Sequence, residues 1–226
     1  MLLAHPAKVA GRCAVRELSA SATKVQESTT SINADDFQLF TGPKVVAPSF
    51  ELQRWASTGI SQFIYGNFVE KTYSKTGFLN GANQAIDLAA LHIRTKNWER
   101  LRAFMTKKCV ERIKNAVETI PSDLLEKRLQ FSYGKGNVVH SFLHSTIVSG
   151  EKVFGLNETG GGYFFNGTIV SFINVSGEPL YAMSLRKLAQ NKGKIVVANV
   201  SIARYIKPPG PWYITNINFF DYPKDA

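Results

Sequence analysis

The pattern of apolar residues changes once along the chain, near residue 127, and this change constrains the fold more than any other feature of the sequence. Before it, apolar residues recur at steps of three and four, which is typical of amphipathic helices. After it, they alternate with polar residues or form short β-branched blocks bounded by glycine, which is typical of strands. Helices followed by strands predict an α+β fold, with N-terminal helices packed on one face of a mainly antiparallel sheet.

The first part of the pattern predicts three helices, over residues 49–70, 78–93 and 97–120. We expect Ser49 to cap the first helix, Pro121 to end the third, and Ser122 to cap one further short turn. The second part predicts five strands, over residues 128–133, 138–149, 163–175, 195–206 and 212–220. Residues 180–190 fit either a strand or a short helix.

Composition is that of a folded protein with an unusually positive charge. The 226 residues are 44% hydrophobic and 19% charged, and the net charge is +10. Such an excess favours phosphate-bearing partners: nucleic acid, ribosome or anionic lipid. No segment approaches the roughly 18 apolar residues that span a bilayer, so we expect a soluble or peripheral protein. Cys13 and Cys109 are too few for a disulfide framework.

The N-terminus has the composition of a mitochondrial transit peptide. Its first 25 residues are rich in Ala and Ser, and four basic residues face one acid, Glu17. Arg16, Leu18 and Ser21 also match a mitochondrial processing pattern, Arg-x-Leu-x-x-Ser. We therefore predict a transit peptide over 1–25, a flexible linker over 26–48 and one domain over 49–226. The alternative for the first segment is a tail without a targeting function.

Basic residues are concentrated in two parts of the chain. From Arg94 to Lys114 there are eight, opposed only by Glu99 and Glu111, and a second group follows residue 178. The predicted anion-binding residues are Arg100, Lys107, Lys108, Arg112, Lys114, Arg186, Lys187, Lys192, Lys194 and Arg204. Three of them, at seven-residue steps, would share one stripe of the third helix. The alternative is a merely solvated face.

The aromatic residues of the first helix suggest a second kind of contact. Trp55, Phe63 and Phe68 lie in a segment with helical periodicity, a combination that suits a membrane interface. Packing of these residues against the domain is the alternative interpretation. Aromatic residues are not interleaved with the basic ones, so we do not expect sequence-specific nucleic-acid recognition.

Two further features raise the question of chemistry. The glycines at 160–162 lack the Lys-Ser/Thr of a phosphate-binding loop, so they predict a turn feeding a strand. His140 and His144 would share one strand face, but no third ligand has metal-site spacing, so we expect no metal. A general base is possible only if the sheet curls so that both imidazoles point inward near Tyr133, Tyr163 or Asp87.

One segment resembles a known family. Residues 63–121 combine an aromatic first helix, the run Phe78-Leu79-x-Gly81-Ala82-x-Gln84-Ala85, a Leu-Arg-Ala-Phe stretch before a basic helix, and a closing Ile-Pro. This pattern resembles the mitochondrial Tim-forty-four-like domain family, and Trp212-Tyr213-Ile214 is similar to that family's last strand. The resemblance covers roughly residues 50–222, and the short chain is most similar to the type that interacts with the m-AAA protease.

The resemblance implies a cone-like, nuclear-transport-factor-like domain without catalytic residues or cofactors, on the matrix side of the inner membrane. It implies partners as well: the m-AAA protease and/or the mitochondrial ribosome, newly made inner-membrane proteins, and peripheral anionic lipid. We therefore expect a non-enzymatic matrix adaptor that assists sorting or protection of new inner-membrane proteins. Docking by charge would make its binding fall steeply with salt. The alternatives are a structural protein of the mitochondrial large ribosomal subunit, and a small cone-fold enzyme that uses His140 or His144.

Overall fold

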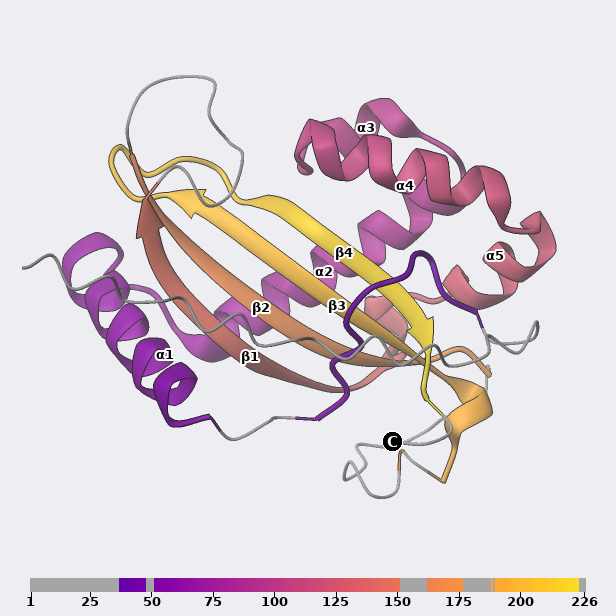
Figure 1. Ribbon diagram of the computed structural model, residues 1–226, viewed down its shortest axis with the longest axis horizontal. Helices are drawn as coiled ribbons and strands as arrows, with labels where there is room; N and C mark the ends of the chain where they lie inside the picture. Colours follow the sequence, from indigo (N-terminus) through magenta and orange to yellow (C-terminus); the bar gives the residue numbers. More distant parts are fainter. Residues whose placement is uncertain (1–36, 48–50, 151–161, 177–187, 189, 224–226) are drawn as a thin grey trace, which may run out of the picture. The chain divides into compact units, whose positions relative to one another are not determined.

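The computed structural model describes residues 37–47, 51–150, 162–176, 188 and 190–223 (Figure 1). The chain divides into two units, residues 1–33 and 34–226, and every described residue belongs to the second. The predicted transit peptide and the segment 180–187 therefore lie outside the described residues.

Four antiparallel strands form one sheet in the order β1-β2-β3-β4. Their bounds are β1 (Val138–Gly150), β2 (Tyr163–Asn174), β3 (Ile195–Tyr205) and β4 (Tyr213–Asp221). Helices precede the strands, so the predicted α+β class is confirmed. The sheet is open, with β1 and β4 as its two edge strands, and the cone-like detail therefore remains a prediction.

Helix α2 (Lys75–Arg94) runs across one face of the sheet (Figure 1). Its apolar residues recur at helical steps, and the inward set, which includes Ile86, Ala89 and Ile93, is fully buried against Ile169 and other residues of β2, β3 and β4. The Ser74 side chain caps the helix by accepting a hydrogen bond from Gly77 N, at 3.0 Å. The expected helix over 78–93 is confirmed.

Phe78 packs directly on the β2 backbone at Gly167. A Cβ atom added to Gly167 would lie 2.6 and 2.7 Å from two carbons of the Phe78 ring, which is inside van der Waals contact. We predict that Gly167→Ala displaces this ring and destabilises the protein by about 1–3 kcal/mol, the usual cost of overpacking. Urea denaturation measures the loss, and Gly81→Ala, where the added Cβ meets no atom within 4 Å, is the matched control.

The predicted third helix is wrong between Ala103 and Thr106. It divides into α3 (Trp98–Arg102) and α4 (Lys107–Thr119) because the intervening backbone pairs with the edge strand β4. Ile214 N donates to Phe104 O at 2.8 Å, and Thr106 N donates to Ile214 O at 3.0 Å. These sheet bonds occupy groups that a continuous helix would need for its own ladder.

The predicted strand over 128–133 is also wrong. Its first residues belong to α5 (Ser122–Leu129), whose Leu125 and Leu129 are buried at a four-residue step. Helix α5 is therefore longer than the single turn expected after Ser122, and its N-cap residue is Pro121. A short 3-10 turn, η2 (Tyr133–Lys135), then leads into β1. The other four predicted strands are confirmed to within a residue or two.

Residues 37–47 are not the linker that the sequence predicts. Phe37 and Leu39 are buried, and their backbones bond along the outer edge of β4. Leu39 N donates to Phe219 O, and Asp221 N donates to Phe37 O, both at 2.8 Å. This segment therefore covers part of the β4 edge. Helix α1 (Leu52–Ile64) begins after it with Glu51 as N-cap residue, and the expected cap Ser49 lies outside the described residues.

Candidate functional site

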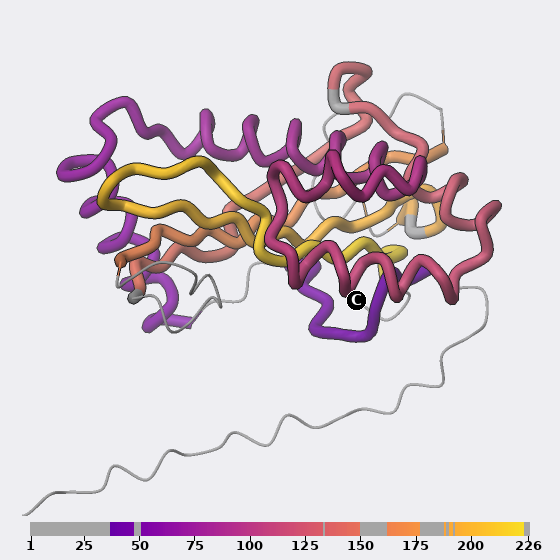
Figure 2. The backbone as a smooth tube through the Cα atoms, turned by 90° about the horizontal axis from the view of Figure 1, so that it is seen from above, coloured from indigo at the N-terminus to yellow at the C-terminus, as the bar shows by residue number. Residues whose placement is uncertain are grey.

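Helix α1 lies beside β1, at the opposite end of the sheet from α3 and α4 (Figures 1 and 2). Its contacts with β1 are polar. Thr146 N donates to Thr58 Oγ1 at 3.2 Å, and Thr146 Oγ1 donates to Thr58 O at 3.1 Å. The Ser61 and Thr146 hydroxyls are 2.6 Å apart, and Ser61 is the one buried residue of α1. The helix therefore turns small polar side chains toward the domain.

The outward side of α1 is apolar, so the helix has the reverse of the usual polarity of a surface helix. This apolar face of α1 consists of Leu52 (68% exposed), Trp55 (68%), Ile60 (60%) and Phe63 (63%), together with Phe68 (75%) in the turn that follows the helix. Arg54 is the single charged residue between positions 52 and 68, and its side chain is only 18% exposed. Solvent-exposed apolar surface of this extent marks a contact site.

The predicted membrane-interface residues Trp55, Phe63 and Phe68 all lie on this face, and none of them is buried against the part of the domain that the structure describes. A π-helical turn, η1 (Tyr65–Val69), follows α1 and keeps Phe68 beside Phe63, with ring centroids 6.4 Å apart. Tyr65, by contrast, is completely buried.

Tyr65 anchors the end of this segment to the sheet. Its hydroxyl donates to Glu70 Oε2 at 2.8 Å, and Arg204 Nη1 lies 2.9 Å from the same oxygen. Its ring lies 4.2 Å from that of Phe165 on β2. Burial, together with the hydrogen bond to Glu70, raises the pKa of Tyr65, which keeps the hydroxyl protonated as a donor. The apolar face of α1 is therefore presented by a fixed element.

The predicted anion-binding residues do not form one surface. Arg100 is exposed on α3, whereas Lys107, Lys108 and Arg112 are exposed on α4. Because the helix divides, the predicted stripe of Arg100, Lys107 and Lys114 does not lie on a single helix. Lys114 is half-buried, and the Arg112 guanidinium lies 3.9 Å from the Phe40 ring, where it holds the segment 37–47.

The structure describes only part of the second basic group. Arg186 and Lys187 lie outside the described residues, and of Lys192 and Lys194 in the turn η4 (Lys192–Lys194), only the half-buried Lys194 has a described side chain. Arg204 is not an exposed cation: its side chain is 15% exposed, and its charge is compensated by Glu70. Of the predicted anion-binding residues, those that are exposed among the described residues are therefore Arg100 on α3 and Lys107, Lys108 and Arg112 on α4. We refer to these four residues as the basic surface of α3 and α4.

The two histidines do not act together. A register shift between Leu143 and Ser145 interrupts the alternation of β1, so the expectation of a shared strand face is wrong. The His140 ring contacts Phe142 and Phe172, whereas His144 Nε2 lies 3.3 Å from Arg54 Nη1 on α1.

The other residues of the expected catalytic group are apart from the histidines as well. Asp87 accepts a hydrogen bond from Ser132, and Tyr163 is 66% exposed. Strand β2 begins directly after Gly162, which contradicts a phosphate-binding loop there, whereas Gly160 and Gly161 of the expected turn lie outside the described residues. Within the described ranges, no group of three or more His, Cys, Asp or Glu side chains could hold a metal ion.

The contact between His144 and Arg54 predicts a pH effect. Burial, and then the charge of Arg54, hold the pKa of His144 below its ordinary value of 6.5. The unfolded chain therefore binds a proton at a higher pH than the folded chain, so stability falls as the pH drops below about 6.5. We predict that His144→Gln flattens this part of the profile, as measured by thermal unfolding between pH 5 and pH 8.

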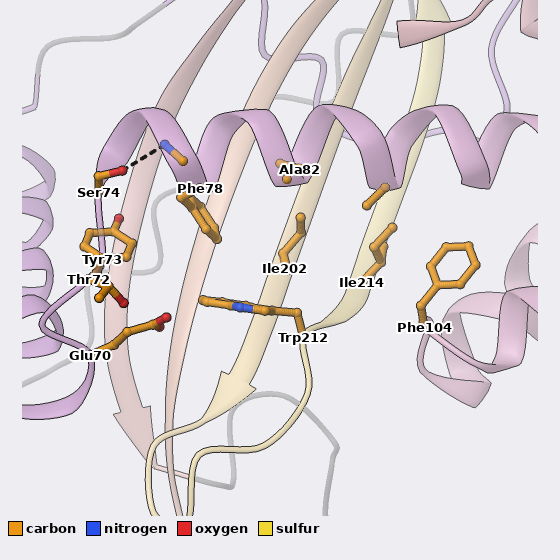
Figure 3. A pocket seen from close by; sticks show the side chains of 13 residues that line it. Glu70, Thr72, Tyr73, Ser74, Phe78, Ala82, Phe104, Ile202, Trp212 and Ile214 are labelled. Atoms are coloured by element: carbon orange, nitrogen blue, oxygen red, sulfur yellow. Dashed lines mark hydrogen bonds between the residues drawn. The ribbon is translucent and has the colours of Figure 1, made fainter. Parts of the chain in front are cut away.

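A cleft of about 290 Å³ lies between α2 and the start of β4 (Figure 3). Four aromatic side chains line it, from Tyr73, Phe78, Phe104 and Trp212. Isoleucines 202 and 214 form the sheet side, and small residues of α2 form the helix side: Gly77, Gly81, Ala82 and Ala85. Glu70, Thr72 and Ser74 complete the lining at one end, and none of the described residues that line the cleft is a histidine.

Sequence reasoning did not identify the residues that line this cleft. On α2, Ala82 is buried, whereas Gly77 and Gly81 are exposed at the cleft. Trp212 was noted only as part of a resemblance. A signal was present in Gly81, an exposed glycine in the interior of a long helix, where glycine costs helix stability and a Cβ atom would meet no other atom within 4 Å.

None of the helices among the described residues combines the length and apolarity needed to cross a membrane. Comparison of the chain with protein-family models, with curated proteins and with solved structures gives no match.

Proposed function

We propose that the protein is a non-enzymatic mitochondrial matrix adaptor that docks on the inner membrane through the apolar face of α1. The observation that carries this proposal is the reversed polarity of α1, with Trp55 and Phe63 outward and Ser61 inward. A helix with an aromatic-rich apolar face lies in the interface plane of a bilayer, with this face among the headgroups and upper acyl chains. The basic N-terminus and the family resemblance supply the mitochondrial location.

The positive charge of the chain supports an anionic membrane as the occupant of this face. Lys71 and Lys75 are exposed just after Phe68, between the apolar face of α1 and α2. Cations beside an inserted apolar face gain roughly 1 kcal/mol each near an anionic leaflet. A second copy of the chain or a soluble protein would not require this pairing of aromatic and basic residues.

The basic surface of α3 and α4 lies toward the other end of the sheet from α1 (Figure 1). Its exposed residues include Arg100, Lys107 and Lys108, and it stays available while α1 is on the membrane. This separation supports an adaptor that meets a second, anionic partner, such as the mitochondrial ribosome. The client would be a newly made inner-membrane protein, and the m-AAA protease is a further proposed partner.

Sedimentation with vesicles tests the proposal. The full chain, with and without residues 1–25, is mixed with vesicles of phosphatidylcholine alone or with cardiolipin. We expect binding to cardiolipin vesicles. Because the apolar face of α1 would carry most of this binding, most of it should persist in 1 M salt, where the screening length is only about 3 Å, whereas docking by charge alone would be lost there. Loss of all binding at 1 M salt, or self-association of the protein without lipid binding, would overturn membrane docking through α1.

The structural ribosomal protein is the second candidate, and the basic surface of α4 is what favours it. It predicts stoichiometric co-sedimentation with the large mitochondrial subunit, whereas an adaptor should be substoichiometric. The outward apolar face of α1 supports the adaptor over the ribosomal protein, because exposed apolar side chains contribute nothing to a purely electrostatic contact with RNA.

A further inference from the structure

The cleft beside α2 is a second site, built from parts of the chain that are distant in sequence. Its lining comes from residues 70–85, from Phe104, from Ile202 on β3, and from Trp212 and Ile214. We infer that this cleft binds a small, uncharged, planar ring compound that carries one hydrogen-bond donor, such as a phenol or a naphthol. This inference goes beyond the proposed function and does not depend on it.

The size of the cleft sets the size of the ligand. An engineered apolar cavity of roughly 150 Å³ in another protein holds one benzene molecule. The present cleft measures about 290 Å³, so it has room for two or three fused rings. Gly81 of α2 borders open space, since a Cβ atom there would meet no atom within 4 Å.

The walls favour rings over a flexible chain. Figure 3 shows Trp212 along one side of the cleft, Phe78 on the α2 side and Phe104 at the far end. Aromatic side chains pair with rings in stacked and edge-on arrangements beyond simple area burial. A rigid ligand also loses less conformational freedom on binding than an alkyl chain does.

The aromatic walls are fixed before a ligand arrives. Phe78 sits on Gly167, and the Trp212 and Phe78 ring centroids are 5.2 Å apart. The Arg204 guanidinium lies 5.0 Å from the Trp212 ring, and Glu70 holds Arg204 in turn. The rings therefore form a preorganised surface.

The charge of the lining argues for a neutral ligand with a donor. Glu70 is the single charged residue among the described residues that line the cleft, so an anion is disfavoured there. Its Oε2 atom already accepts hydrogen bonds from Tyr65 and Arg204. The positive charge of Arg204 offsets the negative charge of the carboxylate. Among the described residues nothing donates to Oε1, and in Figure 3 the carboxyl group extends toward Trp212. A ligand hydroxyl can donate to it.

Equilibrium dialysis with three probes tests the inference. The probes are 2-naphthol, naphthalene, which lacks the donor, and decanoate, an anionic chain of comparable volume. We expect 2-naphthol to bind the full chain at least about tenfold more tightly than either of the others. Tighter binding of decanoate, equal binding of naphthalene and 2-naphthol, or no binding of 2-naphthol at millimolar concentration would each overturn the inference.

Cleft-filling variants locate the binding. Gly81→Leu adds a side chain to the open space and removes a helix-interior glycine, so the fold should be retained. We expect it to weaken 2-naphthol binding at least tenfold, and Ala85→Leu to do the same. Gln84→Leu, on the exposed side of α2 outside the lining, is the matched control and should bind as the unaltered chain does. Unchanged binding by both cleft-filling variants would overturn the assignment.

Discussion

The double substitution Trp55→Glu and Phe63→Glu is expected to weaken binding to cardiolipin vesicles by about 30-fold or more. Burying a large apolar side chain contributes about 1.5–3 kcal/mol, and each tenfold change in affinity corresponds to about 1.4 kcal/mol. Both side chains are more than 60% exposed on the apolar face of α1, so they face water in the free protein. Binding to the membrane would bury them. Vesicle sedimentation across a lipid titration measures the change.

The control for this result lies on another helix. Leu88 and Leu91 are 48% and 40% exposed on α2, and Leu88→Glu with Leu91→Glu adds the same charge outside the apolar face of α1. This control should bind vesicles as the unaltered chain does. Because all four positions are exposed, neither double variant should lower the melting temperature by more than a few degrees. Equal losses of binding in the two variants would show that added negative charge, and not the face of α1, is responsible.

Arg128→Ala is expected to cause the largest loss of stability. Arg128 Nη2 lies 2.9 Å from Asp221 Oδ2 at the end of β4, and the two side chains are only 15% and 10% exposed. The same carboxylate oxygen accepts from Phe37 N at 3.1 Å, so it joins α5, β4 and the segment 37–47. Removing one partner of a buried ion pair costs about 3–5 kcal/mol. For a chain of this size, that lowers the melting temperature by roughly 6–20 °C.

An exposed ion pair provides the comparison for Arg128. Arg102 Nη2 lies 3.0 Å from Glu111 Oε1, but the two side chains are 51% and 45% exposed. Surface pairs contribute about 0–1 kcal/mol, so Arg102→Ala should shift the melting temperature by no more than about 4 °C. Scanning calorimetry compares the two variants. Similar shifts for both would contradict the role assigned to the Arg128–Asp221 pair.

Two of the errors in the predicted fold, in residues 97–120 and 26–48, share one physical origin. The periodicity of residues 97–120 is helical throughout, yet Phe104 and Thr106 bond to the β4 backbone, because an edge strand offers unpaired groups that a local pattern does not reveal. The polar composition of residues 26–48 suggested a linker, but Phe37 and Leu39 found a place along the other part of that edge. In each case a distant strand outweighed the local preference of the segment.

The candidate site likewise has features that the sequence predicted and features that it did not. Trp55, Phe63 and Phe68 were identified from their type and spacing, because helical periodicity places them within one segment. Their exposure could not be predicted, since it depends on which side of α1 meets Thr146 of β1. The prediction that Arg204 is an exposed cation was wrong because Arg204 pairs with Glu70, which is 134 residues away in the sequence.

The sequence by itself determined the α+β class, the position of the long helix and four strands, and the positive charge, because these depend on periodicity and composition. The tertiary structure alone decided that α1 turns its apolar side outward, and that α2, β3 and β4 enclose a ring-lined cleft. Both features depend on contacts between residues far apart in the chain, and the free energy of those contacts exists only once the sheet has formed.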